Sequence, residues 1–129
     1  MKQLRVLAVK DREEAEHLLE DTVTRCGHRV VGVVKADESL VEQITELQPD
    51  IILLDISTMK TGPGIDAVRS ITSRYQIPLL LVTDAVDATV PDFLESIDAA
   101  GCLVKPIGEP ELRVAMDAAI RYQAALNDG

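Results

Sequence analysis

The chain has 129 residues, of which 47% are hydrophobic and 27% charged, a balance typical of one globular domain rather than of a disordered chain. Only 2% are aromatic and the formal net charge is −9, so the sequence lacks the stacking side chains and the basic patch that direct nucleic-acid binding needs. No apolar stretch approaches the ~20 residues of a membrane span and no signal peptide precedes the first predicted strand, so we expect a cytoplasmic protein without a membrane partner.

Apolar runs and helical patterns alternate along the whole chain. Strands are predicted over residues 4–9, 29–35, 50–54, 77–82 and 102–104. Helices are predicted over residues 13–26, about 40–48, 64–75, 89–99 and from 110 onward. Gly27 is expected to cap the first helix. Ser39 and Glu42 form a capping-box pattern before the second helix, although Asp37 is an alternative cap.

Strict alternation of five strands with five helices predicts an α/β fold made as a single domain over residues 1–129. The third strand and the core of the fourth are almost wholly aliphatic, as strands covered on both faces must be. Right-handed crossovers then favour a doubly wound five-stranded parallel sheet of order 2-1-3-4-5, flanked by five helices in the flavodoxin-like manner.

Polar side chains stand where four of the apolar runs stop. They are Asp11, Asp55, Thr83 and Lys105. In a parallel sheet the carboxyl ends of the strands share one edge, which is where open α/β folds place their chemistry. Two acids, a hydroxyl and an amine in one crevice suit a phosphoryl group and a divalent cation.

Each of these residues has a chemical role in that interpretation. The Asp55 carboxylate would attack a phosphoryl group to form an acyl phosphate. Magnesium prefers oxygen ligands, which Asp55, Asp11 and the backbone carbonyl of Ser57 would supply. Lys105 would pair with phosphoryl oxygen, and Thr83 would donate its hydroxyl to the same group.

Together these segments resemble the receiver domain of bacterial two-component response regulators over essentially the whole chain. The matching segments are RVLAVKD at 5–11, PDIILLD at 49–55, IPLLLVT at 77–83 and LVKP at 103–106. The resemblance implies that Asp55 accepts a phosphoryl group from a histidine kinase or phosphotransfer protein, that Asp11 binds magnesium, that Thr83 is the switch hydroxyl and that Lys105 contacts the phosphate. It also suggests a cis bond before Pro106.

Three residues depart from the family pattern. The family has two acids at the end of the first strand, and here the first is Lys10. Its ammonium would either pair with Asp55, taking the metal's place and weakening magnesium binding, or extend to solvent on its long stem. Asp84 stands where a small residue is usual, and either opposes an incoming anion or replaces the missing acid. Cys102 stands where an aromatic switch residue is common.

The resemblance implies a non-enzymatic signalling module that contacts a downstream output protein or domain, with a homodimer as a further option. An alternative is a pseudo-receiver that works through protein contacts without phosphorylation, which Lys10, Asp84 and Cys102 favour. An aspartyl phosphohydrolase would want a second aspartate where the chain has Ser57.

The remaining reactive side chains receive structural interpretations. Cys26 and Cys102 belong to no metal motif and are expected to be buried, reduced thiols. His17 and His28 are expected at the surface rather than as ligands or phosphodonors.

Overall fold

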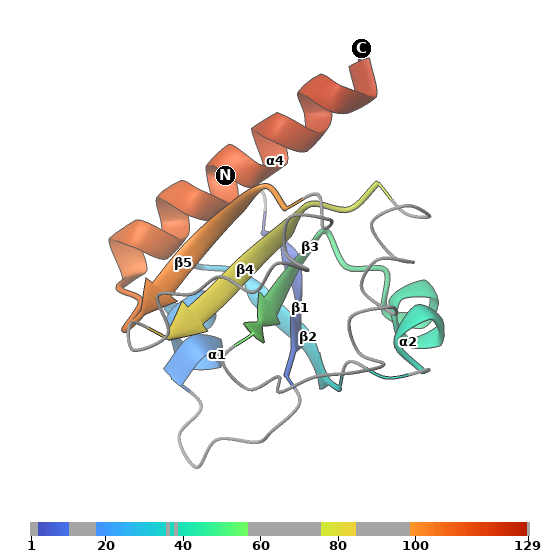
Figure 1. Ribbon diagram of the computed structural model, residues 1–129, viewed down its shortest axis with the longest axis horizontal. Helices are drawn as coiled ribbons and strands as arrows, with labels where there is room; N and C mark the ends of the chain where they lie inside the picture. The colour runs from blue at the N-terminus through green and yellow to red at the C-terminus, as the bar shows by residue number, and fades with distance from the viewer. Residues whose placement is uncertain are drawn as a thin grey trace.

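In the computed structural model, five parallel strands form one sheet of order β2-β1-β3-β4-β5, as predicted (Figure 1). The structure describes residues 3–10, 18–35, 37, 39–56, 76–84 and 99–128. The strands are β1 Arg5–Val9, β2 Arg29–Val34, β3 Ile51–Asp55, β4 Leu79–Asp84 and β5 Gly101–Lys105. The helices are α1 Leu18–Arg25, α2 Leu40–Leu47 and α4 Glu109–Asp128.

Helices cover both faces of the sheet, with α1 and α4 on one side and α2 on the other (Figure 1). Alternation of side chains along each strand divides the core accordingly. In β3, Ile52 and Leu54 pack in the cluster under α2, whereas Leu53 packs in the cluster under α1 and α4. All five residues of β3 are buried, which explains why its sequence is aliphatic up to Asp55. The far end of α4 extends past the strands (Figure 1).

The helix ends follow local rules, with one exception. Gly27 has φ +88° and its N–H donates to the Thr24 carbonyl, as the predicted cap requires. The capping box before α2 is not formed, because the Ser39 hydroxyl donates to Asp37 Oδ1 at 2.6 Å instead. The hydroxyl and the N–H of Ser39 both donate to this carboxylate and lower the pKa of Asp37.

The observed boundaries of the strands and helices differ from the predicted ones by a few residues. β4 and β5 both extend further along the chain than predicted, so Thr83 and Lys105 lie within strands rather than after them. Residues 11–17, at the predicted start of the first helix, lie outside the described residues. So do the helices expected over 64–75 and 89–99, apart from Ala99, which is not helical. The predicted cis bond between Lys105 and Pro106 is present.

Two assignments of burial were wrong. His28 is 5% exposed, and its Nδ1 accepts a hydrogen bond from the Leu4 N–H at 3.0 Å, which ties the turn after α1 to the start of β1. Burial, with the positive charge of Arg113, lowers the pKa of His28. Cys26 is buried as expected, but Cys102 is exposed. Cys102 lies on the edge strand β5, on the face opposite to Leu103, which packs against the cluster under α1 and α4.

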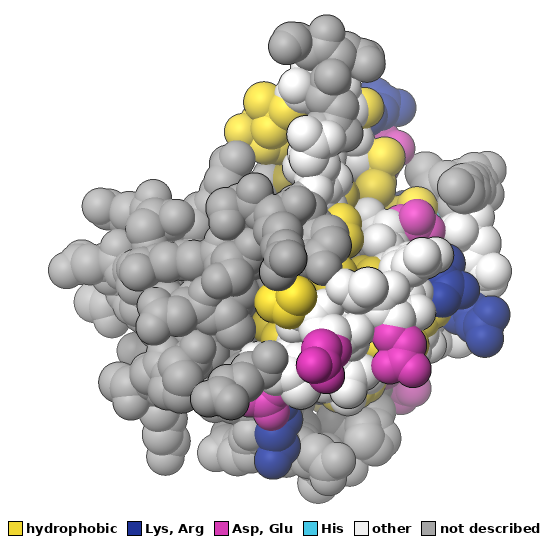
Figure 2. Space-filling model, turned by 90° about the vertical axis from the view of Figure 1, so that its right-hand side faces the viewer, with side chains coloured by type: hydrophobic (Ala, Val, Ile, Leu, Met, Phe, Trp, Pro, Cys, Tyr) yellow, Lys and Arg dark blue, Asp and Glu magenta, His cyan; other side chains and the backbone are white. Residues whose placement is uncertain are grey.

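Figure 2 shows the face on which α2 lies, where the described Lys and Arg side chains are scattered and acidic ones lie between them, without a basic patch. Of the helices that the structure describes, none combines the length and apolar character needed to cross a membrane.

Candidate functional site

The carboxyl ends of the strands meet at one edge of the sheet and bring the charged residues together. In the β3–β4 ladder Asp55 is paired with Val82, and in the β4–β5 ladder Asp84 is paired with Lys105. In the β1–β3 ladder the last pair is Val9 with Leu54, so the residue after Val9 lies beside Asp55.

Asp55 and Lys105 form the centre of this edge. Lys105 Nζ lies 2.7 Å from Asp55 Oδ2, and the exposed fractions of the two side chains are 23% and 0%. Leu53 and Leu103 pack in or against the cluster under α1 and α4, so alternation directs Asp55 and Lys105 to that same face. A buried carboxylate held by a partly exposed ammonium leaves a cation available to an incoming anion from the solvent side.

Lys10 takes neither of the two positions considered from the sequence. It is 5% exposed, so it does not extend to solvent. Its ammonium lies 2.6 Å from Glu20 Oε1 on α1, rather than on Asp55. Sequence reasoning missed Glu20. The sequence carries no signal for this pair, because the burial of Lys10, which calls for an acidic partner, is known only from the structure.

Thr83 and Asp84 occupy the end of β4. Thr83 is half-buried and directly follows Val82, the strand partner of Asp55. Alternation puts Thr83 on the face of Leu81, under α2, and returns Asp84 to the face of Asp55. Asp84 is exposed, so its charge is open to water.

The metal half of the predicted site falls largely outside the described residues, because Asp11 and Ser57 are not among them. Within the described part of the chain, no three His, Cys, Asp or Glu side chains are grouped to hold a metal. The one described ligand fits magnesium, since Asp55 supplies carboxylate oxygen at the sheet edge. The Lys10 ammonium, which one of the two alternatives placed there, is bound to Glu20.

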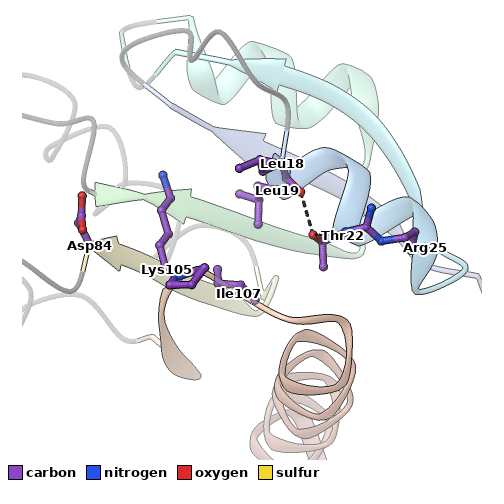
Figure 3. A pocket seen from close by; sticks show the side chains of 8 residues that line it. Leu18, Leu19, Thr22, Arg25, Asp84, Lys105 and Ile107 are labelled. Atoms are coloured by element: carbon purple, nitrogen blue, oxygen red, sulfur yellow. Dashed lines mark hydrogen bonds between the residues drawn. The ribbon is translucent and has the colours of Figure 1, made fainter.

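A cavity of about 370 Å³ lies between α1 and the chain after β5 (Figure 3). Its lining is Leu18, Leu19, Thr22, Arg25, Asp84, Lys105, Pro106 and Ile107. Thr22 donates its hydroxyl to the Leu18 carbonyl at 2.8 Å, so this polar group of the wall is paired within α1. Lys105 lines the cavity and contacts Asp55, so the cavity adjoins the charged site. No pattern in the sequence indicates this cavity, because its wall comes from three separate segments of the chain.

Residues 6–117 match the response regulator receiver domain family. The chemotaxis protein CheY of Thermotoga maritima is 40% identical over 67 residues, which are 52% of this chain and 55% of that protein. The transcriptional regulatory protein AfsQ1 of Streptomyces coelicolor is 33% identical over 122 residues, which are 90% of this chain and 51% of that protein. The chain spans about half the length of these curated relatives.

Solved structures share the fold. The signal receiver domain of a modulated diguanylate cyclase from Desulfovibrio desulfuricans G20 aligns with a TM-score of 0.79 at 23% identity, covering 96% of this chain and 98% of that one. The anti-anti-sigma factor PhyR of Bartonella quintana aligns with a TM-score of 0.78 at 22% identity, covering 99% of this chain and 51% of that one.

Proposed function

Since the chain belongs to the response regulator receiver domain family, we propose that it accepts a phosphoryl group on Asp55 from a histidine kinase and passes the signal on through protein contacts. Receiver domains are non-catalytic modules of two-component signalling that interact with histidine kinases and output domains. The observation that carries the assignment is the ion pair of a fully buried Asp55 with Lys105 at 2.7 Å.

The geometry suits one chemical step. An Asp55 carboxylate oxygen attacks phosphorus, the new O–P bond forms, and the bond from phosphorus to the donor's histidine nitrogen breaks. Lys105 pairs with a phosphoryl oxygen and offsets the added negative charge. We also assign Thr83 a hydrogen bond from its hydroxyl to another oxygen of the group, which requires its side chain to turn from the α2 face over the end of β4.

Receiver domains typically bind Mg²⁺, which neutralises negative charge between the carboxylates and the phosphoryl group. In this chain Asp55, Asp11 and the Ser57 carbonyl would hold it. Lys10 leaves room for the metal beside Asp55 as long as its ammonium stays with Glu20, 2.6 Å away.

The partner that brings the phosphoryl group must approach the same edge. Leu18, 60% exposed, stands on the rim of the cavity beside Lys105 and presents apolar surface there. We expect the phosphodonor protein to bury this leucine when it docks.

The test is the intact mass of the protein after incubation with acetyl phosphate and Mg²⁺. We expect one added phosphoryl group, absent in Asp55→Asn. Asp84→Asn is the matched control, because it removes an exposed carboxylate from the same edge and should leave the mass shift intact. No added mass at saturating donor and metal would overturn the proposal.

That negative result would favour the second candidate, a pseudo-receiver that signals by protein contact alone. One observation favours it, namely that a buried lysine stands where the family has the first of two acids. Its ion pair with Glu20 stabilises the sheet edge without any metal or phosphate.

A further inference from the structure

The ion pair between Lys10 and Glu20 is a fixed feature of the fold. Lys10 Nζ and Glu20 Oε1 are 2.6 Å apart, and the two side chains are 4% and 12% exposed. Charges this far removed from water need a counter-ion close by, and the Lys10 ammonium has Glu20 as its counter-ion. The pair joins the end of β1 to α1.

Lys10 nevertheless stands next to Asp55. Val9 and Leu54 are paired in the β1–β3 ladder, so the next residue of each strand lies roughly one strand spacing, about 4.8 Å, from the other. Leu53, two positions before Asp55, and Val6, four positions before Lys10, both pack in the cluster under α1 and α4. By alternation, the Asp55 and Lys10 side chains therefore leave the sheet on that same face. The four-carbon stem of a lysine spans that distance.

We propose that Glu20 is a positioning residue, which holds the Lys10 ammonium against α1 and so keeps it off the Asp55 carboxylate. This inference rests on the proposed acceptor role of Asp55. A second ammonium on a carboxylate that already binds Lys105 would lower its nucleophilicity and fill the space through which the phosphoryl group approaches. Glu20 therefore acts on the acceptor through Lys10, without touching the reacting atoms.

Two variants separate positioning from simple structural support, because they break the same ion pair from opposite sides. Glu20→Gln leaves the Lys10 ammonium buried and free to turn to Asp55. Lys10→Met removes the ammonium altogether. We expect phosphorylation by acetyl phosphate to slow about tenfold or more in Glu20→Gln, the effect of about 1.4 kcal/mol of barrier, and to stay within about threefold of the parent in Lys10→Met. The double variant should behave like Lys10→Met.

A second measurement needs no phosphate. The ¹³C shift of the Asp55 carboxyl, assigned by its loss in Asp55→Asn, should change in Glu20→Gln and remain close to the parent value in Lys10→Met. Far-UV circular dichroism establishes that each variant is folded at the assay temperature. Equal slowing in both single variants, or an unchanged Asp55 signal in Glu20→Gln, would overturn the inference. If the parent itself gains no phosphoryl mass, the acceptor role fails, and the carboxyl shift still decides where Lys10 goes.

Discussion

Removal of the Lys105 charge should cost far more stability than removal of the Asp55 charge, although both changes break one ion pair. Lys105→Met removes the ammonium beside a carboxylate whose exposed fraction is 0%, whereas Asp55→Asn leaves an ammonium that is 23% exposed and can turn to water. Breaking a buried pair typically costs about 3–5 kcal/mol, and the partial exposure of Lys105 places this case near 3 kcal/mol. For Asp55→Asn we expect less than about 1 kcal/mol.

The assay is urea unfolding at pH 7 followed by far-UV circular dichroism, because the chain has no tryptophan. For a domain of this size, about 3 kcal/mol corresponds to a fall of roughly 10 °C in Tm. The double variant Asp55→Asn with Lys105→Met should recover most of the unfolding free energy lost in Lys105→Met, since the buried Asp55 charge is then absent. Equal costs for the two single variants would show that the pair behaves as a solvated surface bridge and would refute the burial argument.

The other predictions concern His28 and Cys102, the two side chains whose burial was predicted wrongly from the sequence. Burial lowers the pKa of His28, so the unfolded chain takes up its proton at a higher pH than the native chain, and stability should fall as pH drops below about 6.5. In His28→Gln, which keeps an acceptor for the Leu4 N–H, the shift in urea midpoint between pH 7 and pH 5 should shrink, and an unchanged shift would contradict the assignment. With a maleimide, the exposed Cys102 should react first and the buried Cys26 slowly, so Cys102→Ser should abolish the fast phase; two equally fast thiols would be the contrary result.

The sheet, and the position of Asp55 at its carboxyl edge, could be predicted because their signals are local. A run of buried aliphatic residues that stops at Asp55 is visible in the sequence, and the alternation of such runs with helical patterns favours this strand order once crossovers are right-handed. Lys105 before Pro106 marks the neighbouring strand end in the same way. The proximity of Asp55 and Lys105 followed from topology alone, and the structure places their charged atoms in contact.

The wrong or missing predictions for Glu20 and His28 share a physical cause, because the environment of each side chain depends on a segment distant in the sequence. Glu20 is the partner of Lys10 only because α1 packs against that edge of the sheet. His28 is buried because the N–H of Leu4, at the start of β1, needs an acceptor. Cys102 lies in an apolar run too short to show by alternation which of its residues face outward. The functional roles of Asp11, Asp55, Ser57, Thr83 and Lys105 remain predictions.

The length of α4 has a mechanical consequence. The helix has 20 residues and is therefore about 30 Å long, yet its buried residues, Leu112, Met116 and Ala119, all lie within its first eleven residues. A helix held by packing near its N-terminal end transmits a small tilt to its C-terminal end as a larger displacement. A tilt of about 5° at the packed end displaces the far end of such a helix by about 2.6 Å. Because α4 begins shortly after Lys105, a small adjustment at the Asp55–Lys105 ion pair would be magnified into a displacement of atomic size at Asp128.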